Sequence, residues 1–186
     1  MLSDLVPIID GRVDSGKFRI TTLRFGHVPV AGVSTYCTLG MSDHVLVDAD
    51  GAACRHELMT VAYDTFAADD LASFLVSLAD SIVNKHVALH RGEVLGPCDP
   101  IVPFAHVRAV YMSLPVIFPD EFMRPTHPMD PATSIVWALP ITAEEAEFVR
   151  SYGWSEFEAA LEADDRCDFF NLNRPSVAGL AARRVE

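Results

Sequence analysis

Residues 55–82 read RHELMTVAYDTFAADDLASFLVSLADSI, and this stretch contains two hydrophobic patterns in succession. The first part, residues 55–63, has the composition of a strand. In the second part, apolar residues recur at the spacing of one helix face, and Asp69 is the expected N-cap. A helix with a single apolar face must cover another surface, so the stretch predicts a helix packed on a sheet. The recurring apolar residues are Leu71, Phe74, Leu75, Leu78 and Ile82.

Two more strands are predicted before this stretch. Residues 18–25 alternate in polarity, and residues 32–39 (GVSTYCTL) are rich in β-branched and aromatic side chains. Gly40 and the polar pair Ser42-Asp43 end the second strand, and the two polar side chains are expected to bond to nearby backbone. Residues 48–51 (DADG) predict a tight turn, because Asp tolerates turns and Gly supplies a positive φ.

Two further strands and a long loop are predicted after the helix. Residues 107–114 and 134–139 have strand composition, and five prolines between them, from Pro115 to Pro131, exclude a central strand. A loop of this length in a compact domain is either functional or simply variable, and the sequence does not decide between these alternatives.

The C-terminal part predicts two short capped helices. Thr142 and Glu145 form a capping box, and Gly153 fits the left-handed position that ends the first helix near residue 152. Ser155 and Glu158 repeat the capping pattern and predict a second helix to residue 163. Several strands, one long helix and two capped helices indicate an α+β domain. Phe148, Val149, Phe157 and Leu161 are expected on the buried sides of these two helices.

Composition narrows the function further. The chain has 186 residues, with 26 acidic and 14 basic side chains and a net charge of −12. This charge excludes a general nucleic-acid binder and a protein that docks on anionic lipid, whereas it favours a basic protein partner. Acidic residues concentrate in the C-terminal helices, as a solvated face or as a surface that steers such a partner. They are Glu144, Glu145, Glu147, Glu156, Glu158, Glu162, Asp164 and Asp165.

The sequence also predicts a cytoplasmic protein. No signal peptide begins the chain, and no apolar run approaches the roughly 18 residues of a membrane helix. The four cysteines are scattered without a C-x-x-C motif and are expected to be buried small hydrophobes. Lys17 and Lys85 are the only lysines, a composition typical of a GC-rich bacterial genome.

No residues form a recognisable catalytic, metal or cofactor site. His86 and His90 have the i, i+4 spacing of zinc ligands on a helix, but no general-base Glu lies between them and Gly92 ends any helix. Adjacent Ser42, Asp43 and His44 cannot converge as a triad. Phosphate-binding glycine motifs are absent. We therefore expect no catalytic residues, no metal and no cofactor. A small hydrolase that uses His44, His86 or His90 with an acid or a metal is the alternative.

Four segments resemble the suppressor of fused (SUFU-like) family, in the order that the family has them. TLGMSDH at residues 38–44 resembles the family's TLG-S element, and RHEL at residues 55–58 resembles its EL strand. LPITAEEAEF at residues 139–148 and NRPSV at residues 173–177 are similar to its later elements. The resemblance covers residues 32–177.

The resemblance implies a mixed, largely antiparallel sheet flanked by helices, and a protein-binding rather than catalytic role. Animal members clamp a peptide with the help of a second domain. Bacterial single-domain members include immunity proteins that neutralise toxins, and many toxins are basic. We therefore expect one domain over residues 1–186 with a protein partner such as a basic toxin. The sequence does not indicate an oligomeric state.

If the protein binds a partner, roles can also be expected for individual residues. The family motifs are expected to be structural, and partner contacts are expected at Asp43 and His44, where a strand ends, or in the loop from Pro119 to Pro131. The residues carried over as structural are Gly40, Ser42, Thr142, Glu145, Arg174 and Pro175.

Overall fold

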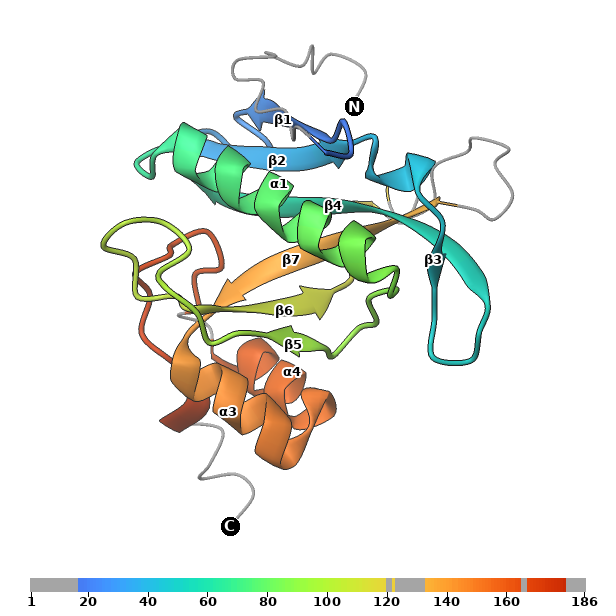
Figure 1. Ribbon diagram of the computed structural model, residues 1–186. Coiled ribbons are helices and arrows are strands. Elements are labelled where there is room, and N and C mark those ends of the chain that lie inside the picture. Colours follow the sequence, from blue (N-terminus) through green and yellow to red (C-terminus); the bar gives the residue numbers. More distant parts are fainter. Residues whose placement is uncertain (1–16, 120–121, 123–132, 165–166, 180–186) are drawn as a thin grey trace.

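The computed structural model describes residues 17–119, 122, 133–164 and 167–179 (Figure 1). Its centre is one sheet with the strand order β1-β2-β4-β7-β6-β5, and β3 pairs with β4 beside this path. The strands are β1 (Thr21–Gly26), β2 (Val33–Leu39), β3 (Leu46–Val47), β4 (Ala53–Tyr63), β5 (Val94–Leu95), β6 (Ala109–Ser113) and β7 (Thr133–Ile141).

The sheet is mixed because one pair at its middle is parallel. β4 and β7 run in the same direction, from Arg55 opposite Thr133 to Met59 opposite Trp137. The other neighbouring strands pair antiparallel. The predicted mixed, largely antiparallel sheet is thus confirmed, and the strands expected near residues 18–25, 32–39, 55–63, 107–114 and 134–139 all form.

Helix α1 (Ala68–Lys85) covers one face of the sheet, as its apolar stripe predicts (Figure 1). β7 separates two cores by simple alternation, because successive side chains of a strand point to opposite faces. Val136 and Ala138 pack in the core beneath α1, and Trp137 and Leu139 pack in the core on the other face. The sheet is therefore buried on both sides.

The predicted N-cap of α1 is wrong. Ala67 occupies that position, and its carbonyl accepts the first bond of the helix from Leu71 N at 3.2 Å. Asp69 lies inside the first turn with Asp70, where a carboxylate is favoured by the helix dipole. The sequence pattern placed the acidic residue correctly at the helix start but assigned the wrong role to it.

Helices α3 (Ala143–Tyr152) and α4 (Trp154–Ala163) lie together near β5 and β6 and bury Phe148, Val149, Phe157 and Leu161 as predicted. The capping box of α3 is confirmed. The one expected at Ser155 is wrong, since α4 begins at Trp154 without a side-chain cap. Gly153 both ends α3 and precedes α4, with φ at 90°, so no separate capping residue fits between the helices.

Glu145 and Arg174 form a buried ion pair that joins α3 to the C-terminal segment. Glu145 is 0% exposed and Arg174 is 2% exposed. The guanidinium donates two bonds to the carboxylate, at 2.5 and 2.8 Å, and a third to the Pro175 carbonyl at 3.3 Å. The carboxylate also accepts from the backbone N–H of Thr142 at 2.9 Å and of Val177 at 3.0 Å. One side chain therefore caps a helix, pairs with a cation and anchors a distant segment.

Burial alone lowers the pKa of Arg174, but the hydrogen bonds and the charge of Glu145 outweigh this effect, so that the pKa is raised. The arginine thus stays charged inside the protein. Glu145, which the sequence grouped with the acidic surface of the C-terminal helices, belongs to the interior instead.

The predicted turn is confirmed, whereas the predicted burial of the cysteines is not. The turn at residues 48–51 forms, with Asp48 accepting bonds from the N–H groups of Asp50 and Ala52. The four cysteines are free, but none is fully buried as predicted: Cys37, Cys54 and Cys167 are half-buried and Cys98 is exposed. The proline-rich loop lies mostly outside the described residues. Among the helices that the structure describes, none combines the length and the apolar character of a membrane span.

We expect Arg174→Ala to lower the free energy of unfolding by about 3–5 kcal/mol, because it leaves the Glu145 carboxylate buried without its cation. Arg91→Ala is the control: it removes a partly exposed ion pair with Glu158 and should cost about 1 kcal/mol or less. Urea unfolding measures both losses. Arg174→Lys, which keeps the charge but not the paired geometry, should lie between wild type and Arg174→Ala. Equal losses for Arg174→Ala and Arg91→Ala would contradict this account.

Candidate functional site

The first candidate site is the turn that follows β2. It is a short 3-10 helix, η1 (Met41–Asp43), preceded by Gly40 with φ at 100°. A Cβ at Gly40 would meet the Arg19 carbonyl oxygen at 3.0 Å, so that this position is reserved for glycine by space as well as by φ. β2 thus ends before Gly40 and the polar pair Ser42-Asp43, as the sequence predicts.

A single carboxylate on β4 holds this turn in place. Glu57 Oε1 accepts from the backbone N–H of Gly40 and of Ser42, both at 3.0 Å, and from Ser42 Oγ at 2.7 Å. Its Oε2 accepts from Thr38 Oγ1 at 2.5 Å. The predicted bond from the Ser42 hydroxyl to nearby backbone is therefore wrong, since the hydroxyl donates to Glu57 on a distant strand. The segment at residues 38–44 and the RHEL strand are held together through Glu57.

The two predicted contact residues differ in how free they are. Asp43 is exposed, and no side-chain bond of Asp43 occurs within the described part of the chain. His44 is half-buried: its ring packs edge-on against Phe18 with centroids 5.3 Å apart, and its Nε2 lies 3.2 Å from the Phe18 carbonyl oxygen. Asp43 is therefore available to a partner, whereas His44 already has a structural contact.

A second candidate site is a pocket of about 180 Å³ between α4 and the sheet. Its floor includes Trp137, whose buried indole Nε1 has no hydrogen-bond partner among the described residues. In its lining, Tyr111 donates to Glu158 Oε1 at 2.7 Å, and Arg91 Nε donates to the same oxygen at 3.0 Å. Burial and, next, the bond to Glu158 raise the pKa of Tyr111. Its walls include Leu139, Leu161 and Phe169.

This pocket could hold an apolar group that brings a hydrogen-bond acceptor to the indole. The hydroxyl of Tyr111 is held in its neutral form and is therefore not an activated nucleophile. Sequence reasoning placed Tyr111 and Trp137 only as strand residues, since nothing in the local pattern brings α4 over them. The predicted surface and this pocket are thus built from different segments.

The histidines do not converge on a metal site in the part of the chain that the structure describes. No group of three potential metal ligands occurs there. α1 ends at Lys85 and His86 is its left-handed C-cap, so that His86 and His90 never have the i, i+4 geometry of a helix. The zinc arrangement considered from the sequence is therefore not formed.

Sequence reasoning missed one polar cluster on β4. His56 Nδ1 lies 2.7 Å from Ser134 Oγ, and His56 Nε2 lies 3.8 Å from Cys54 Sγ. Burial lowers the pKa of His56, while burial and then Asp48 raise the pKa of the Cys54 thiol. An activated cysteine needs the opposite shift of its pKa, so the geometry does not create a nucleophile. Pairing of β4 with β7 brings this cluster together, and no local motif reveals it.

Comparisons with known proteins agree with this picture. A family model described as suppressor of fused protein (SUFU) matches residues 16–175. The immunity protein YqcF of Bacillus subtilis (strain 168) is 26% identical over 174 residues, which are 88% of this chain and 84% of YqcF.

Solved structures show the same fold. A suppressor of fused homologue from Neisseria gonorrhoeae FA 1090 matches with a TM-score of 0.70 at 18% identity, over 92% of this chain and 85% of that one. A chain of a Sufu–Fu complex matches with a TM-score of 0.68 at 13% identity, over 99% of this chain and 90% of that one. Drosophila Suppressor of Fused matches with a TM-score of 0.63 at 13% identity, and the match covers 89% of this chain and 44% of the Drosophila chain. The resemblance seen in the sequence is confirmed: this chain belongs to the suppressor of fused (SUFU) family.

Proposed function

We propose that this chain is a non-enzymatic immunity protein that binds and neutralises a basic protein toxin. The observation that carries the proposal is the similarity to immunity protein YqcF over most of both chains. The match to a chain of a Sufu–Fu complex supports a protein partner, and the net charge of −12 supports a basic one. Four free cysteines support a reducing compartment such as the cytoplasm. We also propose that residues 1–186 act as a single domain.

The proposal is tested by co-expression with the product of a neighbouring toxin-like gene. We expect this chain to restore growth of cells that express the toxin, and to form a complex that size-exclusion chromatography detects. An unrelated acidic protein of similar size serves as the control for non-specific charge. If toxin and chain neither associate nor rescue growth, the immunity function is wrong.

We propose that Asp43 contacts the partner, because its carboxylate is exposed on a turn that Glu57 holds rigidly. Preorganisation lowers the entropy that binding would otherwise cost. His44 is proposed to support this contact beside its packing on Phe18.

Asp43→Arg should weaken toxin binding by more than about 1 kcal/mol and leave the fold intact. Asp50→Arg is the matched control, because Asp50 is equally an exposed acidic turn residue and the change in net charge is the same. Isothermal titration calorimetry gives both affinities. Equal losses for the two variants would mean that net charge matters and this turn does not. His44→Ala should weaken binding as well, with an additional loss of stability from the Phe18 contact.

We expect His56 to influence folding rather than to act on a substrate. Its folded pKa is lowered first by burial, so below about pH 6.5 the unfolded chain binds more protons than the folded one. Stability from His56 is therefore complete above about pH 6.5 and is lost as the pH falls through the lower folded pKa.

His56→Gln should reduce the loss of stability between pH 7 and pH 5.5, and should leave toxin neutralisation unchanged. Urea unfolding at the two pH values, compared with wild type, measures this effect. The interpretation fails if the variant keeps the full pH dependence, or if it retains its stability and loses neutralisation.

A further inference from the structure

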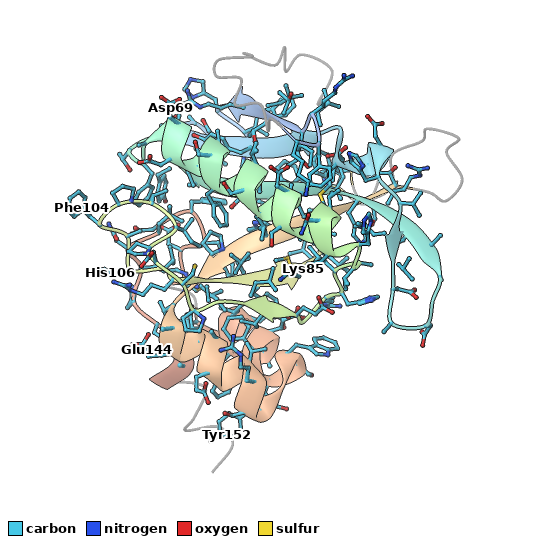
Figure 2. The ribbon with its side chains drawn as sticks, in the orientation of Figure 1. Asp69, Lys85, Phe104, His106, Glu144 and Tyr152 are labelled. Carbon is cyan, nitrogen blue, oxygen red and sulfur yellow. The ribbon has the colours of Figure 1, made fainter. Side chains whose placement is uncertain are left out.

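The loop between β5 and β6 presents an aromatic side chain to solvent. Phe104 is 96% exposed, more than any other large hydrophobic residue that the structure describes. Figure 2 shows its ring projecting outward from the loop at the edge of the molecule. A phenylalanine exposed to this extent gains almost nothing from the folding of its own chain, because the apolar surface stays in water.

The exposure does not result from a loose loop. Val102 and Ala105, which flank the tip, are buried, and Ala105 N donates to the Val102 carbonyl at 3.1 Å. The next two residues are tied to the C-terminal segment, because His106 N and Val107 N both donate to the Leu172 carbonyl, at 3.1 and 3.3 Å. The ring is therefore held outward by an anchored backbone.

The backbone at the tip adds a second cost. Residues 102–105 form a turn with Pro103 at its second position and Phe104, with φ at 65°, at its third. A positive φ at that position identifies a type II turn, where glycine or asparagine is favoured and a bulky residue is strained. Folding would be served better by glycine, both by its lack of an apolar ring and by its conformational freedom.

Acidic groups lie beside this turn. A groove of about 350 Å³ runs between the first half of α1 and the loop, and its lining includes Asp70, Asp99 and Pro103. Asp70 belongs to α1 and Asp99 to the loop, and a carboxylate from each suits the cationic end of a lysine or arginine side chain. Among the described residues, the lining of the groove contains no basic side chain. The nearby His106 and Arg108 line a different pocket, together with Glu144.

We infer that the turn at residues 102–105 is a docking site for a basic protein whose surface has an apolar pocket. The ring of Phe104 enters that pocket, while a lysine or arginine of the partner enters the groove between Asp70 and Asp99. Aromatic anchors that become buried on binding are typical of interface hot spots. This inference rests on the proposed function, and it adds a second contact surface to the one at Asp43.

The strain makes a specific test possible. Phe104→Gly should raise the melting temperature, because it relieves the positive φ, and should weaken toxin binding at least about tenfold. His86→Gly is the matched control: His86 is exposed, has φ at 54°, and caps the opposite end of α1. It should also raise the melting temperature but change the affinity by less than about twofold. The inference is supported if both variants are more stable than wild type and only Phe104→Gly binds the toxin more weakly.

The groove is tested separately. Asp70→Asn combined with Asp99→Asn should slow association with the toxin and reduce its dependence on salt. Surface plasmon resonance at low and high salt measures both quantities. Unchanged association at both salt concentrations would show that the groove takes no part.

Photo-crosslinking identifies the occupant without assuming it. Phe104→p-benzoylphenylalanine should crosslink in living cells to a protein with a net positive charge, and mass spectrometry names it. The same replacement at Tyr152, another exposed aromatic residue, is the control. Support requires that the named protein, once purified, binds Phe104→Gly at least about tenfold more weakly than wild type. No crosslink above the control, a crosslink to a second copy of this chain, or an acidic captured protein overturns the inference.

The outcomes separate the inference from the function on which it rests. If wild type and Phe104→Gly neutralise the toxin equally, the docking surface is wrong and the immunity function stands. If wild type fails to bind the toxin at all, the immunity function is wrong, and the docking surface is decided by the protein crosslinked at residue 104.

Discussion

The buried pair of Glu145 and Arg174 is the interaction on which the rest of the structure depends. Removing two charges from water is expensive, and the attraction between them compensates only if the remaining polar atoms are also satisfied. Here backbone N–H groups of Thr142 and Val177 complete the carboxylate, so the pair tolerates its burial. Because it joins residues 29 positions apart, it fixes α3 and the C-terminal segment together on one face of the sheet. Glu57 plays a similar part, because its carboxylate accepts backbone bonds from the turn and so holds η1 against β4.

These two carboxylates explain what the family-like motifs specify. The segments around residues 38–44 and 55–58 meet through Glu57, and those around residues 139–148 and 173–177 meet through Glu145. In each case the carboxylate holds backbone in position. A motif that maintains architecture permits different partners on the same scaffold, because function depends on the surface that the scaffold carries.

The sequence predicted those features that depend on local patterns. Strand alternation, the stripe of α1 and the capping box at Thr142 arise within a few residues, and all of them form. The prediction failed where an adjacent element determines the local structure. Gly153 is both the C-cap of α3 and the N-cap of α4, so that Ser155 does not cap α4. The burial of Glu145, the pocket over Trp137 and the cluster at His56 depend on contacts between distant segments, which no pattern in one sequence specifies. Asp43 was predicted as a contact residue, and its role stays a prediction.

Two features of this molecule lower the stability of its fold without any compensating contact within the described residues. Excess negative charge repels itself and opposes compaction, and Phe104 combines an exposed ring with an unfavourable φ. Under the proposed function the two act at different ranges. Charge acts over about 8 Å at physiological salt and chiefly raises the rate at which a basic partner arrives. The ring acts only on contact, so its burial slows dissociation. A surface that combines both would capture a toxin quickly and release it slowly, which is what neutralisation requires.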